Sequence, residues 1–387
     1  MTARNAVLAS IGLAALTVYI LACTSFSPDD SKVLYPIFDG SQGIIGTAVY
    51  DRSARHSEIV FTPSVIENGT NLAASPTLLR SQWFADGRRV LHTWALGDSG
   101  LSLAVTPVGS RGPVRYYLLP ALANGQEKMM LPVALAGERV FLLETADVVL
   151  RLDLTTGAVE RHQLTVNSNK VALYPAPRND TVFYLENRSS EDKCVFGRMN
   201  PDSFALTPLV TMTNEFSGGS FFAYDSTGTR VGGIEKTGEE LRLVVLETGK
   251  PAFTRLVSTN AGGLSFGSAT FSPKGDLLLA GFRRAQAEGP YASFGLMEIP
   301  LSQAPIRETV LLSKVKTSDG MAALYFQAGV SHDGRTAAAA STYLAATAEE
   351  FKPEECALFF IDLTDAKRKV TRVPIPMPAQ RPMGWTK

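Results

Sequence analysis

The sequence predicts an all-β protein, a β-propeller of seven four-stranded blades preceded by an N-terminal apolar helix. Three observations support this fold: one turn motif returns at near-regular intervals, short apolar strands flank each copy, and hardly any stretch shows helical periodicity. With 387 residues, 45% hydrophobic and 19% charged, the chain has a globular composition and suffices for one large β domain. We therefore expect residues 24–387 to form a single propeller.

The N-terminus combines an early charge with a long uncharged run. Arg4 precedes the run 6–22, which is somewhat long for a signal-peptide core and at the short limit for a spanning helix. Three alternatives follow: a lipoprotein signal peptide with lipidation at Cys23, an uncleaved membrane anchor, and ordinary cleavage or none of these. Because Arg4 precedes the run and Asp29 and Asp30 follow it, the leading alternatives place the protein on the membrane, facing the periplasm or cell exterior.

The residues Ile20-Leu21-Ala22-Cys23 resemble a bacterial lipobox, in which the cysteine becomes the lipidated first residue of the mature protein. The resemblance implies that Cys23 carries the lipid. In the alternative, Cys23 is one more residue of an anchor helix.

The repeated motif consists of a short apolar stretch, a tight polar turn and a second apolar strand. Five clear copies lie at 25–30, 83–87, 222–228, 270–275 and 330–334, and two degenerate copies lie at 134–137 and 177–180. Their turn residues are spaced about 43 to 59 residues apart, in the range of four-stranded propeller blades. Seven copies imply seven blades. Because degenerate turns define blades three and four, six or eight blades remain alternatives.

The chemistry of the motif is local. Asp-Gly or Lys-Gly between two apolar runs supplies a residue that tolerates positive φ, which a two-residue hairpin turn requires. His332 occupies the turn position that Pro28 and Pro273 hold in sister repeats. Closure of the ring leaves two alternatives: residues 381–385 supply the innermost strand of the first blade, or the first blade begins at about residue 25.

The turn motifs resemble the WD40-like repeats of TolB-type propellers, whose signature is an aromatic residue, Ser-Pro-Asp-Gly and an apolar strand. The resemblance extends from residue 25 to about residue 376. It implies a propeller architecture and no particular activity. The TolB family has a separate α/β domain before the propeller, and this sequence shows none. The role of TolB is therefore not carried over.

Composition and cysteine spacing exclude several functions. Lys plus Arg equals Asp plus Glu, 37 each, so no net field favours nucleic acid. The three cysteines are far apart and none forms a C-x-x-C pair, which argues against structural zinc and dithiol redox chemistry. Cys194 and Cys356 fall in blades four and seven, too far apart for a disulfide. We expect no cofactor, no metal and no nucleic-acid partner.

Two serine motifs resemble catalytic sequences. Residues 263–267 match G-x-S-x-G, but a strand and a hairpin follow where a nucleophile elbow needs a helix. Residues 97–100 match only part of the serine-protease motif. We interpret the first as a loop between blades and the second as a polar turn. The acidic groups at 29–30 and 349–355 lack the spacing of a calcium loop, so we assign no catalytic or metal-binding residue.

Long loops on a rigid scaffold are where binding usually occurs, and two insertions stand out, at 283–290 in blade six and 347–355 in blade seven. The candidate partner-binding residues are Arg283, Arg284, Glu288, Tyr291, Glu349, Glu350, Phe351, Lys352, Glu354 and Glu355. We expect a membrane-tethered, non-catalytic scaffold that binds protein partners in an envelope complex. The alternative is a small-ligand sensor or hydrolase-like enzyme with its site in the central channel. Several charged or histidine side chains there would favour the alternative, whereas small and apolar ones would favour the scaffold.

Overall fold

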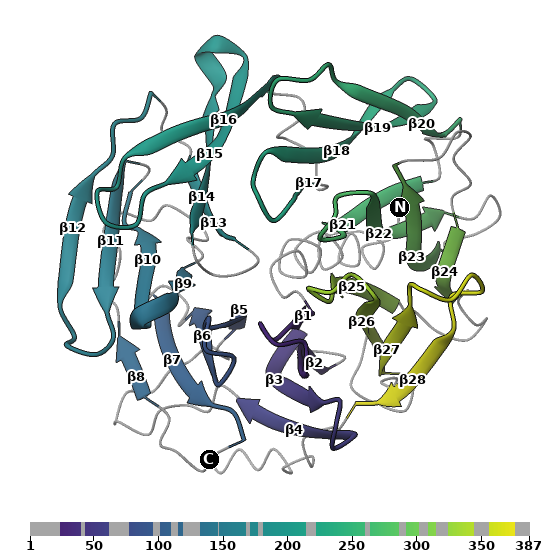
Figure 1. Cartoon of the computed structure of the whole chain (residues 1–387), viewed down its shortest axis with the longest axis horizontal. Coiled ribbons are helices and arrows are strands. Elements are labelled where there is room, and N and C mark those ends of the chain that lie inside the picture. The colour runs from purple at the N-terminus through teal and green to yellow at the C-terminus, as the bar shows by residue number, and fades with distance from the viewer. Residues whose placement is uncertain are drawn as a thin grey trace, which may run out of the picture.

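The computed structural model contains seven four-stranded antiparallel sheets arranged around a central axis (Figure 1). It describes residues 24–39, 43–61, 77–95, 101–109, 115–118, 132–145, 147–167, 171–176, 181–213, 222–259, 264–285, 292–301, 309–314, 324–343 and 356–375. The prediction of seven blades is confirmed. It holds for the two degenerate repeats, because residues 134–143 and 182–185 belong to different sheets.

Each blade is a meander whose strands follow chain order from the axis outward (Figure 1). Blades one to four consist of β1 (Ser25–Phe26), β2 (Lys32–Asp39), β3 (Gly43–Asp51), β4 (His56–Phe61); β5 (Thr77–Trp83), β6 (Arg89–Ala95), β7 (Leu101–Pro107), β8 (Arg115–Leu118); β9 (Val133–Leu135), β10 (Arg139–Leu143), β11 (Val148–Asp153), β12 (Val159–Gln163); β13 (Val171–Pro175), β14 (Val182–Arg188), β15 (Lys193–Met199), β16 (Leu206–Thr213). Blades five to seven consist of β17 (Phe222–Tyr224), β18 (Arg230–Thr237), β19 (Glu240–Glu247), β20 (Phe253–Ser258); β21 (Leu264–Phe271), β22 (Leu277–Ala285), β23 (Ala292–Pro300), β24 (Thr309–Lys314); β25 (Leu324–Val330), β26 (Thr336–Tyr343), β27 (Ala357–Asp362), β28 (Val370–Pro374).

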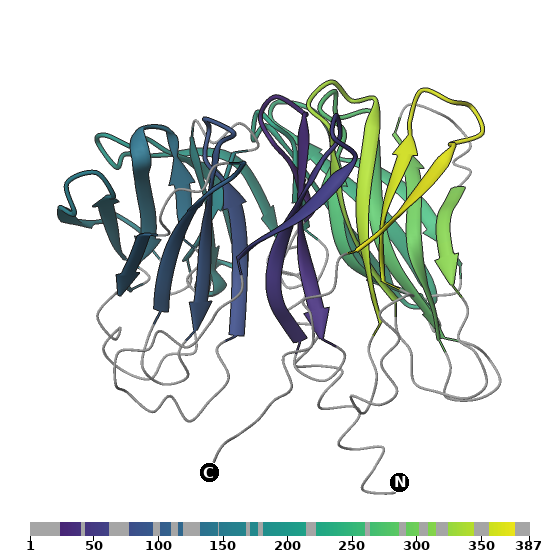
Figure 2. The same cartoon turned by 90° about the horizontal axis from the view of Figure 1, so that it is seen from below.

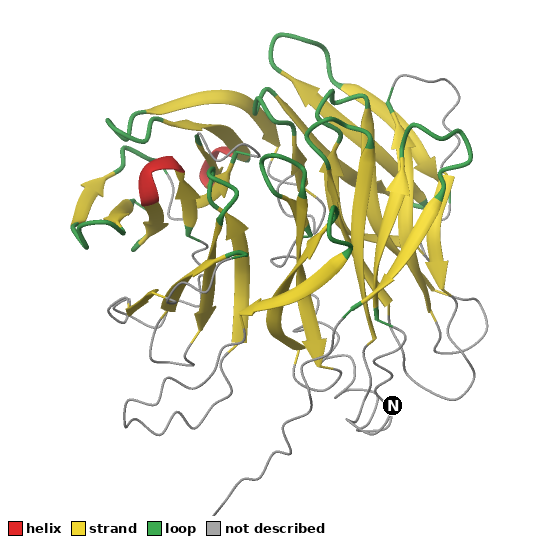
Figure 3. Ribbon diagram, turned by 60° about the horizontal axis from the view of Figure 1, so that its bottom comes forward, coloured by secondary structure: helices red, strands yellow, loops and turns green. Residues whose placement is uncertain are grey.

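Helix is confined, in the described part of the chain, to the short 3₁₀ helices η2 (Ala136–Glu138) and η3 (Ser189–Glu191) (Figure 3). No helix among these residues is long and apolar enough to cross a membrane. The apolar run 6–22 and Cys23, on which we predicted an N-terminal helix or lipid anchor, lie outside the described residues.

The ring has two different faces (Figure 2). The turn face carries the tight connections from the first to the second strand of each blade. The loop face lies at the opposite ends of the blades, where the second and fourth strands end. Because successive strands are antiparallel, β1 runs toward the turn face and β28 runs away from it. The chain therefore enters blade one and leaves blade seven from the side of the loop face.

The turns between the first and second strands contain four residues in most blades and three in blade three, so the prediction of a two-residue hairpin is wrong. In blade one the backbone N–H of Ser27 donates to the carbonyl of Lys32 at 2.9 Å, and that of Asp30 donates to the carbonyl of Ser27 at 2.8 Å. The expected positive φ is present at the last residue of this β-turn, 58° at Asp30 and 64° at Gly87. The Ser27 hydroxyl is buried and accepts a hydrogen bond from the N–H of Lys32 at 2.9 Å, which explains the serine of the motif.

The first strand is short because of a proline. Only Val33 and Leu34 of β2 pair with β1 among the described residues. In an antiparallel strand, every second residue directs its backbone N–H and C=O to the same neighbouring strand. The carbonyl of Lys32 bonds to Ser27 on the axis side, so the backbone nitrogen of Pro36 also points toward the axis. It has no N–H to donate, and the ladder ends before it. Since β1 is the innermost strand here, blade one begins at residue 25, while residues 381–385 lie outside the described residues.

Apolar side chains fill the spaces between neighbouring blades. Alternate residues of a strand point to opposite faces of its sheet, so Tyr184 of β14 packs with blade three and Phe183 packs with Val231 of blade five. Cys194 and Cys356 are both buried, in blades four and seven as predicted, and no disulfide joins them. The core of the molecule is therefore a set of apolar layers between adjacent sheets.

A glutamine joins the inner strands of blades two and three. Gln82 of β5 is buried, and its Nε2 donates to the carbonyl of Ala134 in β9 at 3.0 Å, while its Oε1 lies 3.4 Å from the N–H of the same residue. The amide side chain thereby takes the place of a strand neighbour for Ala134.

Replacing Gln82 by leucine is expected to lower the free energy of unfolding by about 1–2 kcal/mol, because both Ala134 groups lose a buried partner. Urea unfolding followed by tryptophan fluorescence measures the change. The matched control is Gln163→Leu on the exposed strand β12, expected to change stability by less than about 0.5 kcal/mol. Equal stability of Gln82→Leu and the wild type would contradict this role.

Candidate functional site

The residues proposed for partner binding lie on two connections of adjacent blades. Arg283 and Arg284 lie just before the end of β22 and pair in register with Phe294 and Ser293 of β23. The other candidates, and Cys23, lie outside the described residues: Glu288, Tyr291, Glu349, Glu350, Phe351, Lys352, Glu354 and Glu355. Both insertions join the second to the third strand of their blades. The strands that flank them therefore end on the loop face of blades six and seven.

The innermost strands have mainly small or apolar residues at the partly exposed positions that the structure describes. The partly exposed residues of these strands, within the described set, are Ser25, Arg80, Ser81, Val171, Ala172, Tyr174, Pro175, Tyr224, Ala269, Thr270, Ala328, Gly329 and Val330. Arg80 is the charged member of this set. Among these described positions a single charged side chain is available to orient a small-molecule substrate.

A buried polar chain links blades one and two. The Thr47 hydroxyl lies 2.7 Å from the Ser81 hydroxyl, which lies 2.8 Å from Nδ1 of His92. The His92 ring is fully buried and stacks on Phe61, with 4.3 Å between ring centroids. Serine beside histidine is the arrangement of a nucleophile and its base. Burial, however, lowers the pKa of His92 to about 3, and such an imidazole is a poor general base near neutral pH.

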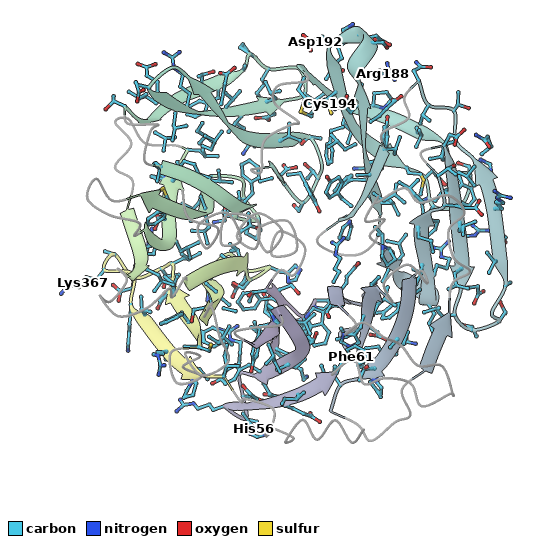
Figure 4. All side chains as sticks on the ribbon, turned by 180° about the vertical axis from the view of Figure 1, so that it is seen from behind. His56, Phe61, Arg188, Asp192, Cys194 and Lys367 are labelled. Atoms are coloured by element: carbon cyan, nitrogen blue, oxygen red, sulfur yellow. The ribbon has the colours of Figure 1, made fainter. Side chains whose placement is uncertain are left out.

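The four histidines are dispersed. His56 lies on the outer rim of blade one (Figure 4), His92 lies in blade two, His162 of blade three stacks on Phe204 at 4.3 Å, and His332 of blade seven contacts Asp30. No group of three or more His, Cys, Asp or Glu side chains that could hold a metal ion occurs in the part of the chain that the structure describes.

The serine of the G-x-S-x-G sequence lies within a strand. Ser265 belongs to β21 and is in register with Arg283 of β22. We predicted a loop between blades, but the strand begins earlier, at Leu264, because the pairing with β22 continues to that residue. An extended strand differs from the strand-to-helix turn of a nucleophile elbow. The other serine motif, at 97–100, lies outside the described residues.

Sequence reasoning missed an aromatic contact between blades three and four. Phe204, in the turn after β15, has φ 59° and is buried. Its ring lies under the guanidinium of Arg151, 5.3 Å from the centroid, and against His162. The Asn-Pro-Asp-Ser sequence before it is typical of a turn. Nothing local, however, predicts a phenylalanine in the left-handed conformation, and its packing on blade three helps to offset the strain.

The chain matches no protein-family model and no curated protein. Three solved structures are similar to it. TolB from Acinetobacter baumannii has a TM-score of 0.44 and 12% identity, covering 73% of this chain and 63% of its own, so the chain spans less than two thirds of that TolB. The β-propeller domain of Cps50 (Swd1) from Myceliophteria thermophila has a TM-score of 0.44 and 12% identity, covering 67% and 78%. A proposed 6-phosphogluconolactonase from Bacteroides uniformis has a TM-score of 0.46 and 12% identity, covering 88% and 94%.

These likenesses concern the fold. TolB, whose repeats the sequence resembles, is among the similar structures. The sheet topology itself gives the architecture: the chain is a seven-bladed β-propeller.

Proposed function

We propose that this protein is a membrane-tethered, extracytoplasmic scaffold, a non-catalytic propeller that binds protein partners in an envelope complex. The observation that carries the proposal is the composition of the innermost strands, where Arg80 is the one charged residue among the partly exposed positions that the structure describes. The depressed pKa of His92 supports it, because the Ser81–His92 pair then has a weak base. A rigid ring whose described residues show no assembled acid–base set is suited to presenting surfaces.

The path of the chain supports an orientation for this scaffold. The chain enters blade one from the side of the loop face (Figure 2). An N-terminal tether therefore draws the loop face toward the bilayer and leaves the turn face directed away from it. The strand ends that flank both insertions lie on the loop face, so a partner bound there sits beside the membrane.

The test is extraction of the natively expressed protein in mild detergent, with mass spectrometry of whatever co-purifies in a fixed ratio. We expect a stable partner. A photo-crosslinking residue at Arg284, on the loop face of blade six, is expected to capture it. The matched control is the same residue at Lys274, exposed on the turn face of the same blade, expected to capture little.

A lone monomer in this experiment would overturn the scaffold function. It would favour the alternative, a sensor that holds an anionic small ligand on the axis at Arg80. Capture from Lys274 instead of Arg284 would keep the scaffold function and move its partner to the turn face.

A further inference from the structure

Blades one and seven meet without exchanging a strand in the described part of the chain. Side chains and single backbone contacts join them instead. Thr24 is 2% exposed, and its hydroxyl accepts a hydrogen bond from the N–H of Ala340 at 3.3 Å. Its carbonyl lies against Gly329, where any side chain would collide. The residue that follows Cys23 is thus already part of the ring.

Asp30 makes three polar contacts across this seam. One carboxylate oxygen accepts from the N–H of His332 at 2.8 Å and lies 2.8 Å from Nδ1 of the same residue; the other accepts from the N–H of Asp333 at 3.1 Å. Arg52 donates to the carbonyl of Asp30 at 2.9 Å and to the hydroxyl of Thr336 at 3.3 Å.

Both main partners depart from the repeated turn motif. Asp30 has a φ of 58° at the position where Gly87, Gly275 and other repeats have glycine, a conformation that strains a residue with a side chain. His332 stands where a sister repeat has Pro273, and a proline there would have no N–H to donate to Asp30. Each departure removes a favourable turn residue and adds a contact across the seam.

We propose that Asp30 and His332 form a latch that keeps the ring closed and holds the chain that leads to the N-terminal segment. β1 has only two residues, so its strand pairing contributes little to holding it in place. Opening the latch releases residues 24–31 as a local unit and adds about 25 Å of extended chain. The lengthening of a membrane tether rests on the proposed function, whereas the latch itself does not.

Hydrogen exchange measured by mass spectrometry on the full-length protein in mild detergent tests the latch. Asp30→Gly keeps the turn conformation, and relieves its strain, while removing the carboxylate. We expect amide exchange in residues 25–39 and 324–336 to accelerate by about tenfold or more. We expect His332→Ala to do the same, and the double variant to add little to either.

The matched control is Arg55→Gly. Arg55 is exposed and has a φ of 52° in a turn of the same blade, so this change relieves strain without touching the seam. Amide exchange in the same segments of Arg55→Gly is expected to be as slow as in the wild type, or slower.

Unchanged exchange in Asp30→Gly, or equal acceleration in all blades, would overturn the latch. If Asp30→Gly does not fold, Asp30→Asn gives the milder change and the same comparison. Membrane fractionation of the expressing cells before detergent is added reports separately on the tether. Absence of the wild-type protein from the membrane fraction would contradict the proposed function and leave the latch intact.

Discussion

Replacing Arg368 by methionine is expected to lower the free energy of unfolding by about 3–5 kcal/mol, the cost of leaving a buried charge without its partner. Arg368, in the turn before β28, reaches across to blade six. Its Nε donates to Oε2 of Glu298 at 2.7 Å and its Nη2 donates to Oε1 at 2.6 Å. Glu298 is 6% exposed, so its carboxylate is poorly hydrated once the guanidinium is removed. Urea unfolding at neutral pH measures the loss.

Two controls separate the buried charge from lost packing. The double variant Arg368→Met with Glu298→Met is expected to recover most of the stability, because both charges are then gone. Arg242→Met removes the corresponding cation from an exposed pair with Glu240 on β19 and is expected to cost less than about 1 kcal/mol. A loss below about 1 kcal/mol in Arg368→Met, or no recovery in the double variant, would contradict the argument.

The blade count could be predicted from sequence because its signal is local. A glycine such as Gly275 is needed wherever a short segment must adopt positive φ between two apolar strands. That requirement involves only a few neighbouring residues, so it recurs along the chain with the period of the blades. The predicted length of the turn was wrong because it depends on hydrogen bonds. The buried Ser272 bonds across the turn and extends it to four residues, which the pattern of residue types alone does not show.

Contacts between blades could not be predicted, since they join residues far apart in the chain. Arg368 and Glu298, or His332 and Asp30, meet only after the ring has formed. One signal was nevertheless available. Aspartate at a position where the other clear repeats have glycine is unfavourable locally, and such a departure is expected where a residue serves another contact.

The candidate binding loops were identified by their length alone. The fold adds that the strands flanking 286–291 and 344–355 end on one face of adjacent blades, which a meander of antiparallel strands makes necessary. The sequence does not reveal that His92 is a weak base for Ser81, because the pKa of His92 depends on burial among residues of two blades. The same burial makes the stability of the whole ring depend on pH.

Acid is expected to destabilise this protein through His92. Burial lowers the pKa of His92 from its ordinary 6.5 to about 3, so the unfolded chain binds a proton below pH 6.5 that the folded chain does not. The free energy of unfolding therefore falls as the pH falls from 6.5 toward 3. The expected loss is about 3 kcal/mol between pH 6.5 and pH 4, of which about 2 kcal/mol is reached by pH 5.

Urea unfolding at pH 7, 6 and 5 measures this dependence in a range where carboxylates with lowered pKa, such as Asp333, stay ionised. His92→Gln keeps a polar side chain beside Ser81 but cannot titrate, so its stability is expected to stay nearly level over the same range. His56→Gln, on an exposed strand position, is expected to follow the wild type.

The pKa of His92 is low because its surroundings cannot accommodate a second proton on the ring. His92 Nε2 has no hydrogen-bond partner in the described structure, so protonation would create a buried charge with an unsatisfied N–H. The charge would form where Thr47, Ser81 and His92 join blades one and two, and separation of these blades is the expected way for water to reach it. A wild type that loses less than about 0.5 kcal/mol between pH 7 and pH 5, or a His92→Gln variant that loses as much as the wild type, would show that His92 does not control this dependence.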